Sequence, residues 1–339
     1  MNKIELIDKI ISRTLDQEDQ AWGMDINHFD WVPGVGLYGI YRAWKHTGNQ
    51  KYSNLLTAWA AKHKEEAYAV KTVNSTAPMS TLLGLYQDAG SAEYLKICVD
   101  IAEYIVKEAP RTREGGLEHT VTEKVPGFSE QIWADTLFMV CIFLSRLGRI
   151  TENKDYSEEA ARQLAIHHKV LKDQKTGLFY HGWNCEKMDW MSGALWARAN
   201  AWITVSTVEM LEELPGAFEG RQEILNSLLQ QVEALKKVQR ANGMFGTLLD
   251  HPDAYDETSA TAGFAYGIKR GVKKGYIPEE YLEISRRAEE GVVGKINLQG
   301  EVEGVSTGTP IMPSLQDYKR IPLRPTLYGQ GLALLMLCE

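Results

Sequence analysis

Long apolar runs and clusters of basic residues are both scarce in this 339-residue chain. No stretch approaches the ~18 consecutive apolar residues of a membrane-spanning helix, so we expect no membrane partner. The formal net charge is −8, and Lys and Arg form no long run, which argues against a nucleic-acid partner. The first residues, MNKIELIDKIISRTL, mix charged with apolar side chains, so they do not predict a signal peptide. We therefore expect a cytoplasmic protein.

Cysteine pairs and short cofactor motifs are also missing. The four cysteines lie far apart with no C-x-x-C, and we expect free thiols in a reducing compartment. The chain has no H-E-x-x-H, G-x-S-x-G, P-loop or dinucleotide fingerprint. We predict neither a metal ion nor an organic cofactor.

What the chain does have is a repeat of helix pairs. Each copy consists of an apolar helix, a turn and an amphipathic helix, and the copies span residues 36–63, 82–105, 137–168, 203–235 and 264–292. A helix that is apolar all round must be buried, whereas an amphipathic helix covers it from outside. A last apolar helix at 327–337 would pair with the N-terminal helix. The pattern predicts one all-α domain over residues 1–339, an (α/α)6 barrel, with a straight solenoid as the alternative.

Long irregular stretches connect these helices. They cover residues 24–35, 68–80, 110–135, 172–200, 240–262 and 298–326, and they are rich in Gly, Pro, His, Trp and Asp. In a ring of hairpins such loops gather at one mouth, over the N-termini of the inner helices. Long loops in a compact domain are often functional, so we expect the site there.

Asp135 is the one charged residue near the start of an apolar run, QIWADTLFMVCIFL (131–144). It is either the N-cap of an inner helix or an acid used in chemistry. Its neighbours Trp133 and Phe138 are apolar, and apolar surroundings raise the pKa of a carboxyl group. On this reasoning we expect Asp135 to stay protonated near neutral pH, as a general acid requires.

A second cluster, WMSGALWARANAWITV (190–205), contains Trp196, Arg198, Asn200 and Trp202. We interpret it as a loop that ends at Asn200, the N-cap of a helix from 201 to 213. Arg198 has no acidic neighbour in sequence and could grip a sugar carboxylate between the two indoles. The alternative is a structural cation–π pair of Arg198 with a tryptophan.

Four further loop residues have both a functional and a structural interpretation. His119 and His181 lie in successive mouth loops and are either site residues or ordinary solvated histidines. Asn74 precedes an inner helix, where an Asx turn is equally plausible. Glu257 could supply a second carboxylate, or it could be a first-turn acid that complements a helix dipole.

The segments that carry these residues resemble glycoside hydrolase family 105, the unsaturated rhamnogalacturonyl hydrolases, and the related unsaturated glucuronyl hydrolases of family 88. The matching pieces run in order over most of the chain: DWVPGVGLYG (30–39), NSTAP (74–78), QIWADTLFM (131–139), GLFYHGWN (177–184), WARANAW (196–202), DETSATAGFAYG (256–267) and LYGQGLALL (327–335). The resemblance implies an (α/α)6 barrel in which Asp135 is the catalytic acid and base. It assigns substrate-binding roles to Tyr38, Asn74, His119, Gln131, His181, Trp196, Arg198, Asn200 and Trp202.

The resemblance also implies the reaction. The family removes a 4,5-unsaturated uronic acid from the end of a short oligosaccharide, commonly one linked to rhamnose. Asp135 would protonate C4 of the vinyl ether and then take a proton from the water that adds to C5. The hemiketal so formed opens and releases the remaining sugar. One carboxyl group can serve both steps, so no second carboxylate at a fixed separation is required.

One departure from the family pattern bears on the substrate. Ala199 and Ala201 stand where the family usually has glycine, and alanine disfavours positive φ and adds a methyl group. We therefore expect the conformation of this loop, and the sugar that the protein accepts, to differ from those usual in the family. Two alternatives remain: an inverting glycosidase that uses Glu257 as its base, and a sugar-binding toroid without activity.

Overall fold

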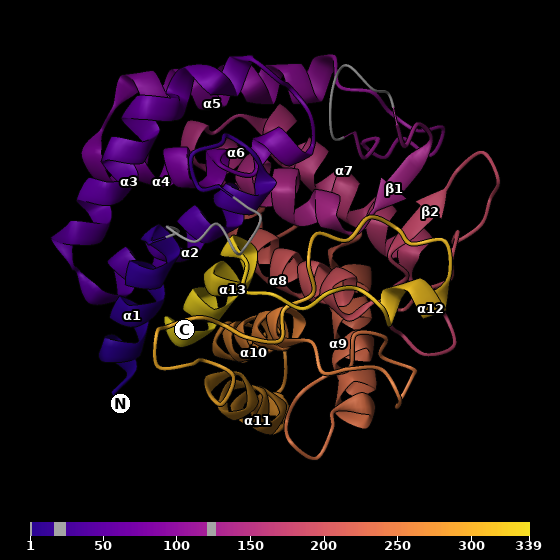
Figure 1. Cartoon of the computed structure of the whole chain (residues 1–339). Helices are drawn as coiled ribbons and strands as arrows, with labels where there is room; N and C mark the ends of the chain where they lie inside the picture. The colour runs from indigo at the N-terminus through magenta and orange to yellow at the C-terminus, as the bar shows by residue number, and fades with distance from the viewer. Residues whose placement is uncertain (1, 17–24, 121–126) are drawn as a thin grey trace.

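Six helices form an inner ring in the computed structural model, which describes residues 2–16, 25–120 and 127–339. The inner helices are α2 (Trp31–Thr47), α4 (Met79–Ala89), α6 (Ile142–Thr151), α8 (Ala197–Glu213), α10 (Thr258–Lys273) and α13 (Leu327–Leu337). Each one contacts the next, and α13 packs against α2, so the ring closes (Figure 1). The chain is therefore an (α/α)6 barrel, as predicted, and not an open solenoid.

The outer ring consists of the amphipathic partners. These are α1 (Lys3–Leu15), α3 (Gln50–His63), α5 (Ala92–Lys107), α7 (Lys154–Leu171), α9 (Arg221–Val238) and α11 (Leu282–Val293). The predicted N-terminal helix is confirmed: α1 buries Leu6, Ile7, Ile10, Ile11 and Thr14 and packs on α13. No helix in the described ranges is long and apolar enough to cross a membrane.

Closure of the ring depends on glycines where α2 meets α13. A Cβ atom built on Gly39 would lie 2.6 Å from Cα of Gly331, closer than real Cβ contacts. The backbones of the two helices therefore approach each other directly. This close approach joins the first and last inner helices of the chain.

Short elements lie in the connections between the helices. Strand β1 (Gln131–Trp133) pairs antiparallel with β2 (Gly182–Asn184), so that Trp133 lies opposite Gly182. The 3-10 helices η1 (Lys64–Tyr68), η2 (Asn74–Thr76) and η4 (Glu279–Tyr281), the π-helical turn η3 (Leu137–Cys141) and the short α12 (Leu315–Tyr318) complete the elements. The sequence analysis did not predict the strand pair. Figure 1 shows β1, β2 and α12 on the same side of the view.

Candidate active site

The strand pair brings Asp135 and His181 together. Asp135 is the second residue after β1, and His181 is the residue before β2. The amide of Ala134 donates to the carbonyl of His181 (3.0 Å), and the amide of His119 donates to the carbonyl of Gln131 (3.0 Å). Three chain segments are thus joined by their backbones, and the two predicted histidines lie on either side of the predicted acid.

The Asp135 carboxyl group points at His181 rather than at a helix end. Its Oδ2 lies 3.3 Å from Nε2 of His181, and its side chain is 14% exposed. The two atoms are close but poorly aligned for a standard hydrogen bond, and neither has another hydrogen-bonding partner among the described residues. The helical cap that follows is at Thr136 and has no side-chain hydrogen bond. The capping alternative for Asp135 is therefore wrong.

The electrostatics of this pair contradict the expected protonated acid. Burial raises the pKa of Asp135, but His181, His119 and Arg198 lower it more, and the net pKa lies below its ordinary value. Burial also lowers the pKa of His181, against the opposing effect of Asp135. At neutral pH the free protein therefore holds a carboxylate beside a neutral imidazole. The prediction failed because it considered only sequence neighbours, whereas His181 is 46 residues away.

Aromatic rings enclose the pair. The ring of Trp133 stacks on His119, with centroids 4.3 Å apart at 9°. Trp196 lies against His181 with centroids 4.2 Å apart. Burial lowers the pKa of His119 to about 4, so its imidazole is also neutral at pH 7. The indole Nε1 of Trp196 is buried without a hydrogen-bonding partner within the described ranges, which leaves a donor available to a polar ligand.

Comparison with known proteins shows to which family this chain belongs. Residues 6–339 match Glycosyl Hydrolase Family 88. The chain belongs to glycosyl hydrolase family 88. An unsaturated rhamnogalacturonyl hydrolase of Bacillus subtilis (strain 168), YesR, is 36% identical over 335 residues, which are 98% of this chain and 93% of that relative.

Solved structures agree with this family 88 assignment. A possible family 105 member from Salmonella enterica has a TM-score of 0.93 at 34% identity, covering 100% of this chain and 94% of its own. The unsaturated glucuronyl hydrolase of Bacillus sp. GL1 has a TM-score of 0.75 at 15% identity, covering 92% and 86%, and shares the fold. The resemblance seen in the sequence is confirmed.

In this family 88 chain, Arg198 is already engaged by the protein. Its Nη1 lies 3.4 Å from Glu257 and 3.0 Å from the carbonyl of Ser306, and its Nη2 donates to Thr307 and Thr309. The guanidinium lies 4.4 Å from the Trp196 ring centroid. Arg198 has no acidic neighbour in sequence, but Glu257, which is 59 residues away in the chain, is its acidic partner in the structure. Its terminal nitrogens hold the 306–309 segment, so they could grip a sugar carboxylate only by giving up these bonds.

The side chains of Glu257 and Asn200 both form hydrogen bonds to buried backbone groups of the protein. Glu257 is fully buried, caps α10 through the amide of Ala260 (2.6 Å), and accepts from the amide of Ser306 (2.9 Å). Asn200 is not the N-cap, because α8 begins at Ala197. Its amide bonds both the N–H and the carbonyl of Phe179 (2.8 and 2.7 Å). The expected substrate contact of Asn200 is therefore replaced by a structural one.

The two alanines that depart from the family pattern lie within the same helix. Ala199 and Ala201 are fully buried and helical, so neither position needs positive φ. A Cβ atom built on Gly263 would lie 2.9 Å from Cβ of Ala201, so the alanine methyl group packs on the glycine of α10. The expected change of loop conformation at these positions is wrong, since there is no loop there.

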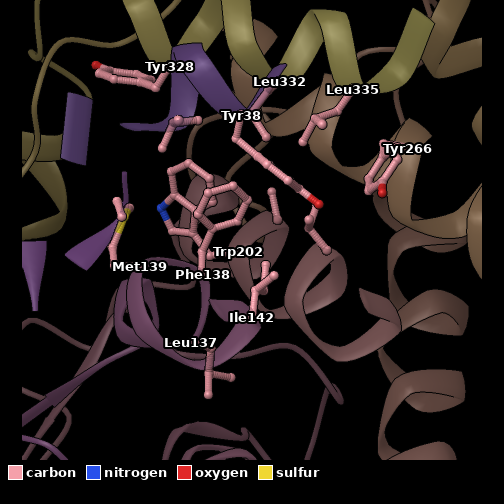
Figure 2. Close-up of a cluster of buried hydrophobic side chains, with 14 of the residues drawn as sticks. Tyr38, Leu137, Phe138, Met139, Ile142, Trp202, Tyr266, Tyr328, Leu332 and Leu335 are labelled. Atoms are coloured by element: carbon pink, nitrogen blue, oxygen red, sulfur yellow. The ribbon is translucent and has the colours of Figure 1, made fainter. Parts of the chain in front are cut away.

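The remaining predicted residues lie at different depths. Gln131 accepts from Nε1 of Trp133 (2.9 Å) beside the site, and Asn74 lies partly exposed in η2 ahead of α4. Tyr38 is buried deeper, and its hydroxyl lies 3.0 Å from Glu209. Figure 2 shows Trp202 beside Phe138 in the barrel interior, with ring centroids 4.6 Å apart. Tyr38 and Trp202 thus belong to the buried core, and Nε1 of Trp202 has no hydrogen-bonding partner within the described ranges.

One residue close to the predicted acid was missed. Tyr318 of α12 is fully buried, and its hydroxyl lies 2.6 Å from Nδ1 of His181. It comes from the 298–326 connection, which was expected at the mouth, but nothing in the sequence distinguished this tyrosine from the others in the chain.

A groove of about 1070 Å³ lies elsewhere on the molecule. It is lined by residues of the α6–α7 turn, of α7 and of the α8–α9 connection, including Glu152, Arg162 and Phe218. These segments follow the C-terminal ends of inner helices, whereas Asp135 stands at an N-terminal end. The groove therefore opens at the other end of the barrel, and we do not place the active site in it.

Three side chains in the described ranges could approach a metal ion. Sγ of Cys185 and carboxylate oxygens of Glu114 and Glu130 lie within 4.8 Å of one another. Burial and the hydrogen bond to Glu114 raise the pKa of Cys185 to about 12, so the thiol stays protonated and is a poor ligand. The group contains none of the predicted site residues, and we assign it no metal.

Proposed function

We propose that this protein removes a 4,5-unsaturated uronic acid from the non-reducing end of short oligosaccharides, with an unsaturated rhamnogalacturonan disaccharide as the expected substrate. The observation that supports this proposal best is a single carboxyl group, Asp135, held by His181 among aromatic rings at the mouth of the barrel. The substrate class follows that in the name of the Bacillus subtilis relative.

Asp135 performs both proton transfers. Because it is a carboxylate in the free protein, it must gain a proton when the substrate binds. The substrate carries its own carboxylate, and a like charge at close range raises the pKa of Asp135. The protonated acid gives its proton to C4, and the resulting carboxylate takes a proton from the water that adds to C5. The hemiketal then opens and releases the second sugar.

His181 supports the first of these steps. Its imidazole is neutral and lies 3.3 Å from Asp135, so it can donate to the carboxylate that forms when the proton leaves. Hydrogen bonds to the charged form stabilise that form. The two protonation states of Asp135 therefore remain close in free energy during the cycle.

The inverting-glycosidase alternative lacks a free base. Glu257 was its candidate, and its carboxylate is bonded to Ala260, Ser306 and Arg198 in the core. A second carboxylate that activates water needs room for that water beside it. The contacts of Glu257 therefore favour the reaction that uses Asp135 alone.

The test follows the ultraviolet absorbance of the conjugated double bond. Mixing the protein with unsaturated pectin-derived disaccharides should bleach it, and saturated counterparts should not be cleaved. Asp135→Asn should slow bleaching by about 10³-fold because it removes the acid and base together. Asp250→Asn, at an exposed aspartate of another connection, is the matched control. Persistent absorbance with every unsaturated disaccharide would defeat the proposal.

We also propose a cytoplasmic location. All four cysteines are free, and three of them are buried. Free thiols persist in reducing compartments. Cell fractionation with an antibody against the protein tests this proposal, and recovery outside the cytoplasm would contradict it.

A further inference from the structure

Tyr318 joins the active site from a distant part of the chain. It lies in α12, 137 residues after His181, and its hydroxyl is 2.6 Å from Nδ1 of that histidine. The same ring packs against Trp196, with centroids 6.0 Å apart. The tyrosine therefore contacts the side of the imidazole that faces away from Asp135.

The contacts of the hydroxyl leave its own proton free for His181. The amide of Met312 donates to the Tyr318 oxygen (3.3 Å), and an amide N–H cannot accept. The hydroxyl proton is then available to Nδ1 of His181. Ser192 also faces this hydroxyl, but its Oγ makes no hydrogen bond among the described residues. With Nδ1 as the acceptor, a neutral imidazole carries its proton on Nε2.

We propose that Tyr318 is a positioning residue for the reaction: by donating to Nδ1 of His181, it keeps the imidazole proton on Nε2, the nitrogen that lies 3.3 Å from Oδ2 of Asp135. The role rests on the proposed function, because Asp135 is the group on which the reaction depends. The tautomer itself is a property of the free protein, and it can be measured whether or not the substrate has been identified.

The charged and titratable groups around Asp135 define what loss of the hydroxyl would change. His181 faces it from the residue before β2, His119 from the segment before β1, and Arg198 from α8. Tyr318 is close enough to interact with it from α12. Without the hydroxyl, His181 can place its proton on Nδ1 and turn a lone pair toward Asp135. A lone pair favours the protonated carboxyl group, so the pKa of Asp135 would rise.

The chain offers a matched control for the substitution. The Tyr255 hydroxyl donates to the carbonyl of Tyr318 (3.2 Å), so it holds the same short helix without touching His181. Each substitution removes one hydroxyl at α12: Tyr255→Phe loses the bond to the carbonyl of Tyr318, and Tyr318→Phe loses the contact with His181 and the bond from the amide of Met312. Only Tyr318→Phe removes the donor to the imidazole.

The decisive experiment measures the tautomer by NMR. Long-range ¹H–¹⁵N spectra of full-length protein with ¹⁵N-labelled histidine distinguish protonated from unprotonated ring nitrogens. The chain has eight histidines, and the His181→Gln spectrum identifies the signals of His181. We expect His181 to be protonated at Nε2 in the wild type and in Tyr255→Phe, and to lose that preference in Tyr318→Phe. A wild-type Nδ1–H tautomer would overturn the proposal even if Tyr318→Phe failed to fold.

The activity readout separates positioning from simple loss of structure. In Tyr318→Phe, kcat should fall about tenfold, the effect of losing one well-placed hydrogen bond. In the pH profile of kcat/KM, the descending limb should also move to higher pH. A merely structural defect would lower the maximum of kcat/KM and leave the position of this limb unchanged. An unmoved limb, or an unchanged tautomer in this variant, contradicts the proposal. A wild-type protein that is inactive on every unsaturated disaccharide would contradict the proposed function, but it would not affect the NMR result on the tautomer of His181.

Discussion

Nε2 of His181 lies 3.3 Å from Oδ2 of Asp135, where a two-stranded ladder places the residue before β2 beside the second residue after β1. This relationship lowers the pKa of a buried carboxyl group that burial alone would raise. The proposed acid, Asp135, is therefore a carboxylate in the free protein, and the proposed reaction requires that the bound substrate raise its pKa.

The first prediction concerns the pH dependence of the wild-type reaction. The step at C4 needs protonated Asp135, so activity should fall as the pH rises. The kcat/KM profile reports the free protein, in which the pKa of Asp135 is lowered, and kcat reports the complex, in which the substrate carboxylate raises it. The descending limb of kcat should therefore lie at higher pH than that of kcat/KM. Coinciding limbs would show that the substrate charge does not act on Asp135.

The second prediction separates stability from chemistry at Glu257. Glu257→Gln leaves Arg198 buried without its carboxylate, so the free energy of unfolding should fall by about 3 kcal/mol. In the variant that remains folded, kcat should stay within tenfold of the wild type. Denaturant unfolding and steady-state kinetics measure the two effects. A loss of kcat as large as that of Asp135→Asn would restore Glu257 as a catalytic base.

The third prediction concerns Asn200. Asn200→Ala leaves the buried N–H and carbonyl of Phe179 without partners, which should cost about 2–4 kcal/mol of stability. KM of the folded variant should change little, because the side chain does not face the substrate. Thermal melting and kinetics test this, with Asn226→Ala at an exposed position as the control. A large rise in KM with unchanged stability would return Asn200 to the binding site.

The fourth prediction is a loss of stability in mild acid. Burial lowers the pKa of His119 and of His167 to about 4 and that of His168 to about 3, from an ordinary value of 6.5. Between these values the unfolded chain binds protons that the folded chain does not. Stability should therefore fall as the pH drops from about 6.5 toward 4, by up to roughly 3 kcal/mol for each histidine.

A variant assigns part of this acid effect to one residue. His168 is held by Ser227 and Thr207 through its two ring nitrogens (2.9 Å each). His168→Gln should make the melting temperature less dependent on pH over this range, whereas His46→Gln, at an exposed position, should not. An unchanged slope in His168→Gln would show that this histidine is not neutral in the fold.

The barrel was predictable because its signal is local and repeated. Each apolar helix followed by an amphipathic one specifies an inner and an outer position, and six such pairs leave few arrangements. The start of α8 was not predictable in the same way. Asn200 is a preferred N-cap residue type, but the helix begins three residues earlier at Ala197, and Asn200 binds a backbone segment that is remote in sequence.

The sequence predicted which residues form the site better than it predicted their protonation states. Asp135, His119 and His181 were expected at the mouth, and the structure brings them together. The protonation state of Asp135 depends on the distance to an imidazole 46 residues away, which local sequence does not contain. Tyr318 was missed for the same reason, since its contact with His181 depends on the path of a long connection.

The most direct test of the account uses an unsaturated disaccharide whose glycosidic oxygen is replaced by sulfur. Hydration attacks the C4–C5 double bond, so the wild type should bleach this analogue at a rate comparable with that of the oxygen-linked substrate, and Asp135→Asn should bleach neither. Rapid bleaching of the oxygen-linked sugar with no reaction of the sulfur-linked one would place the chemistry at the glycosidic bond and contradict the account.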